Sequence, residues 1–402
     1  MVFQLIKSWA DRFFEWLEKY SRSMFWLLKS VLIIVCITLL YSVQNYPFMV
    51  REQIAVQHAA DSAIAAQGNT SDYGVDFKTA SKANLHEFVQ RQINNPLLVV
   101  PNIWTGWRYQ FTQGRSRQFR LTMPVLGYFL GLNVNGLILL QEFCGILMII
   151  LIILLVARIT NDRVLALMFA LGFGFTYLGK ACFIDIRPWF IGMAYFFLLV
   201  SMFSKKPLLI GLSILLASFT DERALIASGL VFIWWKLQLS GGERVRLKDI
   251  FKPDRFTISI VIAWIFYFVI RYILIHRYGF SAFKGSSDIL LNDIRDNYRY
   301  FMMDSLTGIK WFEIFIGLGL ILLLSLKYHL IAVLMLINLA ILAFAALADT
   351  DITKSITFIF PAVFISLFLM VKKGESIKNL RYLTLVIVIL CFIIMTRDIP
   401  AA

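Results

Sequence analysis

Two carboxylates and a guanidinium stand side by side in the segment Thr220-Asp221-Glu222-Arg223. One apolar run ends at Phe219 and another begins at Ala224, so these charges lie where two hydrophobic segments meet. Ionised groups lose their hydration at membrane depth, and a chain keeps them where they meet water, line a cavity or carry out a function. Arginine holds phosphate, and a carboxylate serves as a general base or binds a divalent cation. The segment therefore predicts a site that handles a phosphate and a hydroxyl.

The composition is that of an integral membrane protein. Of the 402 residues, 59% are hydrophobic and 16% are charged, whereas a soluble domain is about half apolar and a quarter charged. The net charge of +14 fits basic loops beside anionic lipid better than nucleic-acid binding, because no basic segment matches a nucleic-acid-reading motif. The four cysteines are scattered through apolar runs without a CxxC pair, which predicts buried thiols and no metal site formed by cysteine.

The predicted fold is all-α, with about 11 transmembrane helices and a helical first extracytoplasmic loop. An amphipathic interfacial helix occupies 1–22, a first transmembrane module with the extracytoplasmic loop 44–120 occupies 23–239, and a C-terminal transmembrane bundle occupies 240–402. A short apolar segment from Arg120 to Leu132 predicts a re-entrant or interfacial helix. The expected spans are 24–43, 137–157, 164–183, 189–203, 207–219, 224–239, 256–275, 309–326, 330–348, 355–371 and 382–395.

The distribution of basic residues orients this topology. Loops rich in Lys and Arg alternate with loops that carry acidic residues, which places the N-terminus in the cytoplasm of a multi-pass inner-membrane protein. The loops 44–120, 184–188, 220–223, 276–308 and 349–354 are then extracytoplasmic. Their candidate functional residues are Glu52, Asp61, Asp185, Arg187, Asp221, Glu222, Arg223, Asp351 and Lys354. A second interpretation stays open, in which Asp185–Arg187 and Asp221–Arg223 are local ion pairs at helix ends.

The order of these features resembles the GT-C superfamily of membrane glycosyltransferases that use polyprenyl-phosphate sugars. The matching segments are Arg120-Leu121-Thr122-Met123-Pro124, Val156-Ala157-Arg158, Asp185 and Thr220-Asp221-Glu222-Arg223. They cover roughly 24–239. The chain departs from the family in its first external loop, where no adjacent acidic pair follows the first span.

The resemblance implies an inverting transfer of a sugar from a polyprenyl-phosphate donor to a glycan or lipid acceptor. Asp61 or Glu52 would deprotonate the acceptor hydroxyl, while Arg187 and Arg223 would stabilise the departing lipid phosphate. Asp221 and Glu222 would orient the acceptor or hold a divalent cation, Mg²⁺ or Mn²⁺. The remaining substrate-binding residues would be Asp185, Asp351, Lys354 and Arg120. The expected partners are this donor, this acceptor and membrane lipids, with no nucleic acid.

Two other functions stay open. A polymerase or ligase of the O-antigen type needs a large external loop late in the chain, for which 276–308 is the candidate. A lipid or glycan flippase needs charged or broken helices near the midplane of the membrane. Glu142 and Lys180 are the main mid-span charges.

Overall fold

The computed structural model describes residues 2–43, 89–97, 119–183, 190–241, 247–280, 308–347 and 352–395, and within these ranges it contains helices and no strands. The all-α prediction is confirmed for this part of the chain. The helices are α1 (Val2–Ser21), α2 (Trp26–Val43), α6 (Thr122–Leu130), α7 (Val134–Thr160), α8 (Arg163–Gly174), α9 (Tyr177–Phe183), α10 (Ile191–Phe203), α11 (Pro207–Thr220), α12 (Arg223–Leu239), α13 (Leu247–Phe251), α14 (Arg255–Tyr278), α16 (Glu313–Ser325), α17 (His329–Leu347), α18 (Ile352–Ile356), α19 (Phe360–Lys372) and α20 (Ile377–Met395), with 3₁₀ turns at Lys310–Phe312 and Thr357–Ile359.

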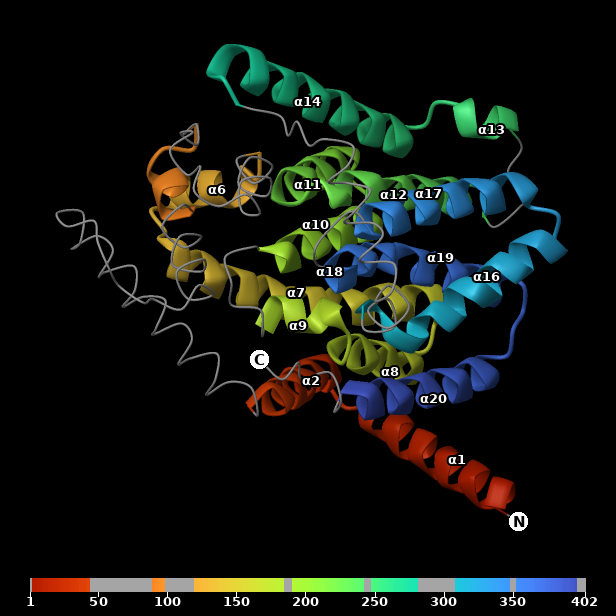
Figure 1. Ribbon diagram of the computed structural model, residues 1–402. Helices are drawn as coiled ribbons and strands as arrows, with labels where there is room; N and C mark the ends of the chain where they lie inside the picture. The colour runs from red at the N-terminus through yellow and green to blue at the C-terminus, as the bar shows by residue number, and fades with distance from the viewer. Residues whose placement is uncertain are drawn as a thin grey trace.

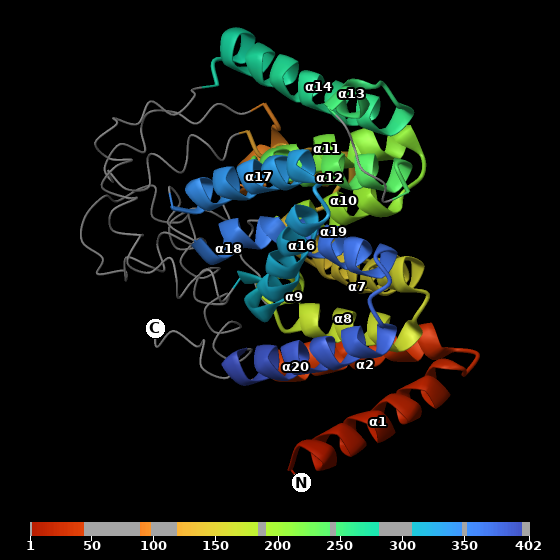
Figure 2. The ribbon, with the colours of Figure 1, turned by 90° about the vertical axis from the view of Figure 1, so that its right-hand side faces the viewer.

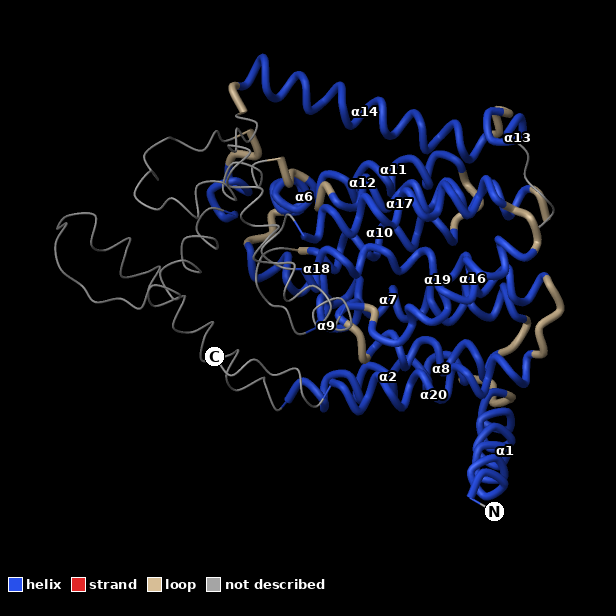
Figure 3. The backbone as a smooth tube through the Cα atoms, turned by 45° about the vertical axis from the view of Figure 1, so that its right-hand side comes forward, coloured by secondary structure: helices blue, strands red, loops and turns tan. Residues whose placement is uncertain are grey.

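Most of the long helices run side by side with nearly aligned axes (Figure 1). Helix α14 lies along one outer edge, whereas α2 and α20 lie along the opposite edge (Figures 1 and 2). Helices α6 and α18 lie toward one end of the bundle, and α13 lies toward the other. Helix α1 departs from this alignment and crosses the direction of the other axes steeply (Figure 3).

Short polar residues begin several of these helices. The first amide groups of a helix lack intrahelical partners, and a side-chain oxygen at the N-cap accepts from one or two of them. Asn133 accepts from the amide of Gly136 before α7, Asp162 from that of Leu165 before α8, and Asp254 from those of Phe256 and Thr257 before α14. These caps fix where the connecting turns end and where the apolar segments begin.

A continuous apolar core fills the bundle and is rich in phenylalanine. Phe173 stacks on Phe312 with ring centroids 4.3 Å apart, and Phe169 and Phe315 pack against the same pair. Helix α19 is buried on all sides, whereas α14 exposes most of its apolar surface. The largest buried cluster contains residues from before and after position 240, so it joins the two predicted transmembrane modules.

Each of the eleven predicted spans contains helix, but the structure does not support a count of eleven spanning helices by length and composition. In the part of the chain that the structure describes, four helical segments are long and apolar enough to cross a membrane, namely Val134–Thr160, Arg255–Tyr278, His329–Leu347 and Ile352–Lys372. The predicted span 164–183 is broken, because α8 and α9 meet at 68° around Phe175; taken together they make a fifth candidate. Other predicted spans are shorter helices, such as α10 and α11 with 13 and 14 residues. The sequence overcounted because an apolar run reports burial, in lipid or in protein, and not length across a bilayer.

The predicted short helix after Arg120 is present as α6, which ends at Gly131 with a φ of +64°, a conformation that glycine adopts without strain. Most of the predicted helical loop 44–120 lies outside the described residues. Within its described part, residues 89–94 are helical.

Candidate functional site

The corner between α11 and α12 is held against α6 by a shared carbonyl. The hydroxyl of Thr220 donates to the backbone oxygen of Leu216, as expected at the end of a helix, and the hydroxyl of Thr122 in α6 donates to the same oxygen at 2.7 Å. Because α6 is fixed to the last turn of α11 in this way, Arg120 just before α6 reaches the corner.

Asp221 lies at this corner with its side chain fully buried. Its carboxylate accepts hydrogen bonds from Arg223 Nε at 2.7 Å, from Arg223 Nη2 at 2.6 Å and from the Arg223 backbone amide at 3.0 Å. Arg120 Nη2 lies 3.2 Å from the same carboxylate. The two nitrogens of Arg223 meet the two carboxylate oxygens in the fork-like geometry that gives arginine–carboxylate pairs their strength.

The electrostatics keep Asp221 ionised. Burial acts to raise the pKa of Asp221, but the positive charges of Arg120 and Arg223, together with the hydrogen bonds from Arg223, outweigh it and hold the pKa well below its usual range. A carboxylate in this state does not exchange protons near neutral pH, so we expect Asp221 to position the two guanidiniums and not to act as a general base. The carboxylate of Asp221 is therefore shared by two guanidiniums.

The last turn of α18 and the 3₁₀ turn after it complete the cluster from far along the chain. Arg223 Nη1 donates to the hydroxyl of Ser355, and the guanidinium lies 5.5 Å from the ring centroid of Phe358. The backbone oxygen of the neighbouring Lys354 accepts from the hydroxyl of the buried Tyr195 at 2.8 Å. The structure therefore brings Arg120, Asp221, Arg223 and the Lys354–Ser355 segment together. We call Arg120, Asp221, Arg223 and Ser355 the corner cluster.

Glu222 turns to the other side of the corner. Its carboxylate pairs with Arg271 of α14 at 2.9 Å, and Arg271 also donates to the hydroxyl of Tyr267 at 2.7 Å and lies over the ring of Phe119. The side chain of Glu222 is 43% exposed. Asp221 and Glu222 therefore have separate partners, even though they are adjacent in the chain.

The described residues do not fit the predicted divalent-cation site. The carboxylates of Asp221 and Glu222 point to different sides of the corner, and the Asp221 carboxylate is already paired with the guanidiniums of Arg120 and Arg223. Within the described ranges, no group of three or more His, Cys, Asp and Glu residues could hold a metal ion. A Mg²⁺ or Mn²⁺ ion at this corner would have to displace an arginine from Asp221.

The other predicted site residues, Glu52, Asp61, Asp185, Arg187 and Asp351, lie outside the described residues, and their roles stay predictions. The structure adds Ser355, Arg271 and Tyr267, which the sequence does not single out. Ser355 adjoins the predicted Lys354. Tyr267 and Arg271 are four residues apart on one face of α14, so their spacing predicts that the two side chains contact each other. The spacing does not predict that Arg271 also pairs with Glu222.

No protein family, no curated protein and no solved structure matches this chain.

Proposed function

We propose that the chain is a membrane glycosyltransferase of the GT-C type, which moves a sugar from a polyprenyl-phosphate donor to a glycan or lipid acceptor on the extracytoplasmic face. The observation that carries this proposal is the corner cluster, in which two guanidiniums share one buried carboxylate. Two guanidiniums side by side suit a lipid-linked phosphate, because arginine binds phosphate oxygens in a fork geometry. The sequence segments that resemble the family include both arginines of the cluster.

In this proposal the corner cluster acts on the leaving group. Transfer of the sugar places negative charge on the lipid phosphate, and fixed cations stabilise that charge more strongly in a water-poor site than in bulk water. Asp221 holds Arg223 in one orientation, so little reorganisation is needed when the charge develops. The base that deprotonates the acceptor hydroxyl is proposed to be Asp61 or Glu52. Arg187 is proposed as a further cation near the phosphate.

The proposal includes the orientation of the chain. The corner cluster would face the outer side of the inner membrane, with the N-terminus in the cytoplasm. The charge distribution supports this orientation, because the described loops at the end opposite α6 and α18 are rich in lysine (Figure 1). They contain Lys205, Lys206, Lys248, Lys252, Lys327, Lys372 and Lys373.

The first test measures binding of a polyprenyl monophosphate to the full chain in lipid nanodiscs. Arg223→Lys and Arg120→Lys keep a positive charge but lose the fork geometry, and we expect each to weaken binding about tenfold, equivalent to about 1.4 kcal/mol. Lys236→Met is the matched control, because it breaks a buried ion pair with Asp254 (2.7 Å) at the far end of α12, roughly 20 Å along the helix from Arg223. Unchanged binding in both arginine variants would contradict the proposal.

The second test measures chemistry. The protein in vesicles is given a panel of polyprenyl-phosphate sugars and radiolabelled transfer is followed, with Asp61→Asn and Glu52→Gln as base variants. We expect loss of transfer in one of the two base variants, with lipid binding intact in both. Full transfer in both would leave the proposed base without support.

A flippase is the second candidate, because the bend between α8 and α9 is a broken helix of the kind that lines transport paths. Thr176 at this break donates to the backbone oxygen of Phe173, and Gly179 approaches Gly174 so closely that a Cβ would meet its carbonyl oxygen at 2.5 Å. Movement of a fluorescent polyprenyl lipid between leaflets of protein-containing vesicles, without any sugar transfer, would favour this function over the first.

A further inference from the structure

Helix α1 presents one face to the bundle. Ala10, Phe14 and Ser21 recur at a spacing of four and seven residues, and all three are buried. Phe14 packs edge-on against Tyr382 of α20 with ring centroids 5.2 Å apart. This buried stripe fixes which side of α1 meets the rest of the protein.

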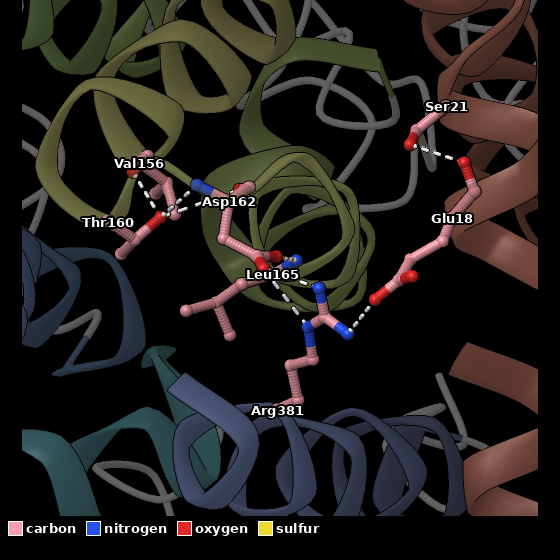
Figure 4. A network of polar contacts seen from close by, with 7 residues as sticks. All are labelled: Glu18, Ser21, Val156, Thr160, Asp162, Leu165 and Arg381. Atoms are coloured by element: carbon pink, nitrogen blue, oxygen red, sulfur yellow. Dashed lines mark hydrogen bonds and ion pairs between the residues drawn. The ribbon is translucent and has the colours of Figure 1, made fainter. Parts of the chain in front are cut away.

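Polar contacts lock the helix in that rotation (Figure 4). Arg381 of α20 donates both to Glu18 of α1 and to Asp162 at the turn between α7 and α8. On the same turn of α20, Tyr382 and Lys378 both contact Asp11, at 2.6 and 3.0 Å. These contacts hold the middle and the C-terminal end of α1, so the helix cannot roll without breaking them.

The locked rotation leaves the two tryptophans of an aromatic stripe exposed, whereas Phe13 and Tyr20 of the same stripe are half-buried against the bundle. Trp9, Phe13, Trp16 and Tyr20 follow one another at spacings of three and four residues, with ring centroids 5.7, 6.2 and 5.9 Å apart. Trp9 and Trp16 are 53% and 60% exposed. Tryptophan and tyrosine favour the boundary between lipid headgroups and acyl chains, because their rings are apolar and carry one polar edge.

Basic side chains flank the aromatic stripe. Arg12 precedes Trp16 by four residues and Lys19 follows it by three, so both are surface neighbours of this ring, and both are exposed. Helix α1 also crosses the bundle axes steeply, as a helix that lies in the plane of a membrane surface would (Figure 3). It belongs to the lysine-rich end of the molecule. This combination of rings and cations is complementary to a surface of anionic phospholipid.

We propose that α1 is a docking helix for anionic phospholipid, in which Trp9 and Trp16 enter the boundary between headgroups and acyl chains while Arg12 and Lys19 pair with lipid phosphates. The contacts of Arg381 and Asp11 hold the two tryptophans toward the lipid. This inference does not depend on the function proposed for the corner cluster.

The test uses nitroxide labels on the full-length protein in vesicles of phosphatidylcholine mixed with phosphatidylglycerol. Single cysteines replace Trp9, Trp16, Ser8 or Glu15 in a background that carries Cys36→Ser, since Cys36 is exposed and the cysteines at 144, 182 and 391 are buried. We expect labels at 9 and 16 to collide several-fold more with oxygen than with a water-soluble nickel reagent. Labels at 8 and 15 should show the reverse preference. The labels at 8 and 15 are the matched controls on the same helix.

A second comparison tests the charge of the lipid. In vesicles of phosphatidylcholine alone, or with Arg12→Gln combined with Lys19→Gln, we expect the preference for oxygen at position 16 to fall several-fold. Equal depth in both lipid mixtures would overturn the role of anionic lipid. Two outcomes would overturn lipid docking altogether. In the first, the labels at all four positions collide with the nickel reagent. In the second, the labels at 9 and 16 are shielded from both reagents and their spectra are broadened by a second copy of the chain.

Discussion

Asp221→Asn is the substitution that tests the corner cluster most directly. Asparagine has nearly the same size as aspartate, so the change removes charge without opening a cavity. The substitution also replaces one carboxylate oxygen by an NH₂ group, which can only donate hydrogen bonds. This group faces guanidinium nitrogens of Arg223 and Arg120, which are donors as well. Both guanidiniums then lose the carboxylate of Asp221 as a partner.

The size of the effect follows from the burial of Asp221. A hydrogen bond to a charged group contributes about 1.5–3 kcal/mol, and removal of one partner from a buried ion pair costs about 3–5 kcal/mol because the other charge stays buried. The side chain of Asp221 has 0% exposure and that of Arg223 has 9%, so solvent screens this pair little. We therefore expect Asp221→Asn to lower the free energy of unfolding by about 3–5 kcal/mol.

The assay is unfolding by SDS in mixed micelles, followed by circular dichroism. The double variant Asp221→Asn with Arg223→Gln should be less destabilised than the sum of its single variants, because it removes both the carboxylate and one of the stranded cations. Lys236→Met is the control for loss of a buried pair elsewhere. An Asp221→Asn protein within about 0.5 kcal/mol of the parent would refute the reasoning, since that is the size of an ordinary surface substitution.

The pH dependence has a defined sign. The pKa of Asp221 is depressed in the folded protein, so its stabilising contribution is complete above the ordinary carboxyl pKa of about 3.9. The contribution is lost as the pH falls below that value toward the folded-state pKa. The parent should therefore lose stability relative to Asp221→Asn on acidification below about pH 4, and the two proteins should differ by a constant amount at higher pH.

Two further predictions concern packing and the exposed side of the corner. Gly319→Ala should destabilise the protein by about 1–3 kcal/mol, because its Cβ would lie 2.5 Å from the Cβ and 3.0 Å from the Cα of Ser366 in α19. Gly317→Ala is the matched control on the same helix, since no heavy atom lies within 4 Å of its Cβ, and thermal unfolding of both variants checks the difference. Glu222→Gln should lower the free energy of unfolding, measured by SDS titration, by no more than about 1 kcal/mol, because the pair of Glu222 with Arg271 is partly exposed and screened by solvent. A decrease as large as that expected for Asp221→Asn would contradict the conclusion that the two carboxylates have separate partners.

The apolar runs of the sequence predict which segments are helical, but not how each helix meets the membrane. The run 164–183 contains no proline or charge pair to mark a break, and yet α8 and α9 separate around Phe175. The reason lies in the contacts at the bend: residue 179 approaches the carbonyl oxygen of Gly174 so closely that it has no room for a Cβ, whereas a hydropathy pattern counts Gly179 only as apolar. Similarly, nothing in the composition of α14 and α19 shows that the first lies at the edge of the bundle and the second at its centre.

For the site, the sequence identifies the charges but not their grouping. The pattern Asp221-Glu222 suggests two carboxylates that work together, whereas the end of α11 directs Asp221 inward to Arg223 and leaves Glu222 to reach α14. Adjacent residues at a helix end point in different directions, so neighbouring positions in a sequence are poor evidence of a shared site. The contribution of Ser355 depends on contact between segments 132 residues apart, which a single sequence does not reveal.

The two ends of the molecule differ in how they use aspartate and arginine, and this difference bears on which end binds an anion. At the turn between α7 and α8, one guanidinium, that of Arg381, is shared by the carboxylates of Asp162 and Glu18. At the corner cluster the numbers are reversed, because one carboxylate, that of Asp221, is shared by the guanidiniums of Arg120 and Arg223. Guanidiniums bind phosphate oxygens in a fork geometry, whereas carboxylates repel them. Of the two clusters, the corner cluster is therefore the one at which we propose that a lipid phosphate binds.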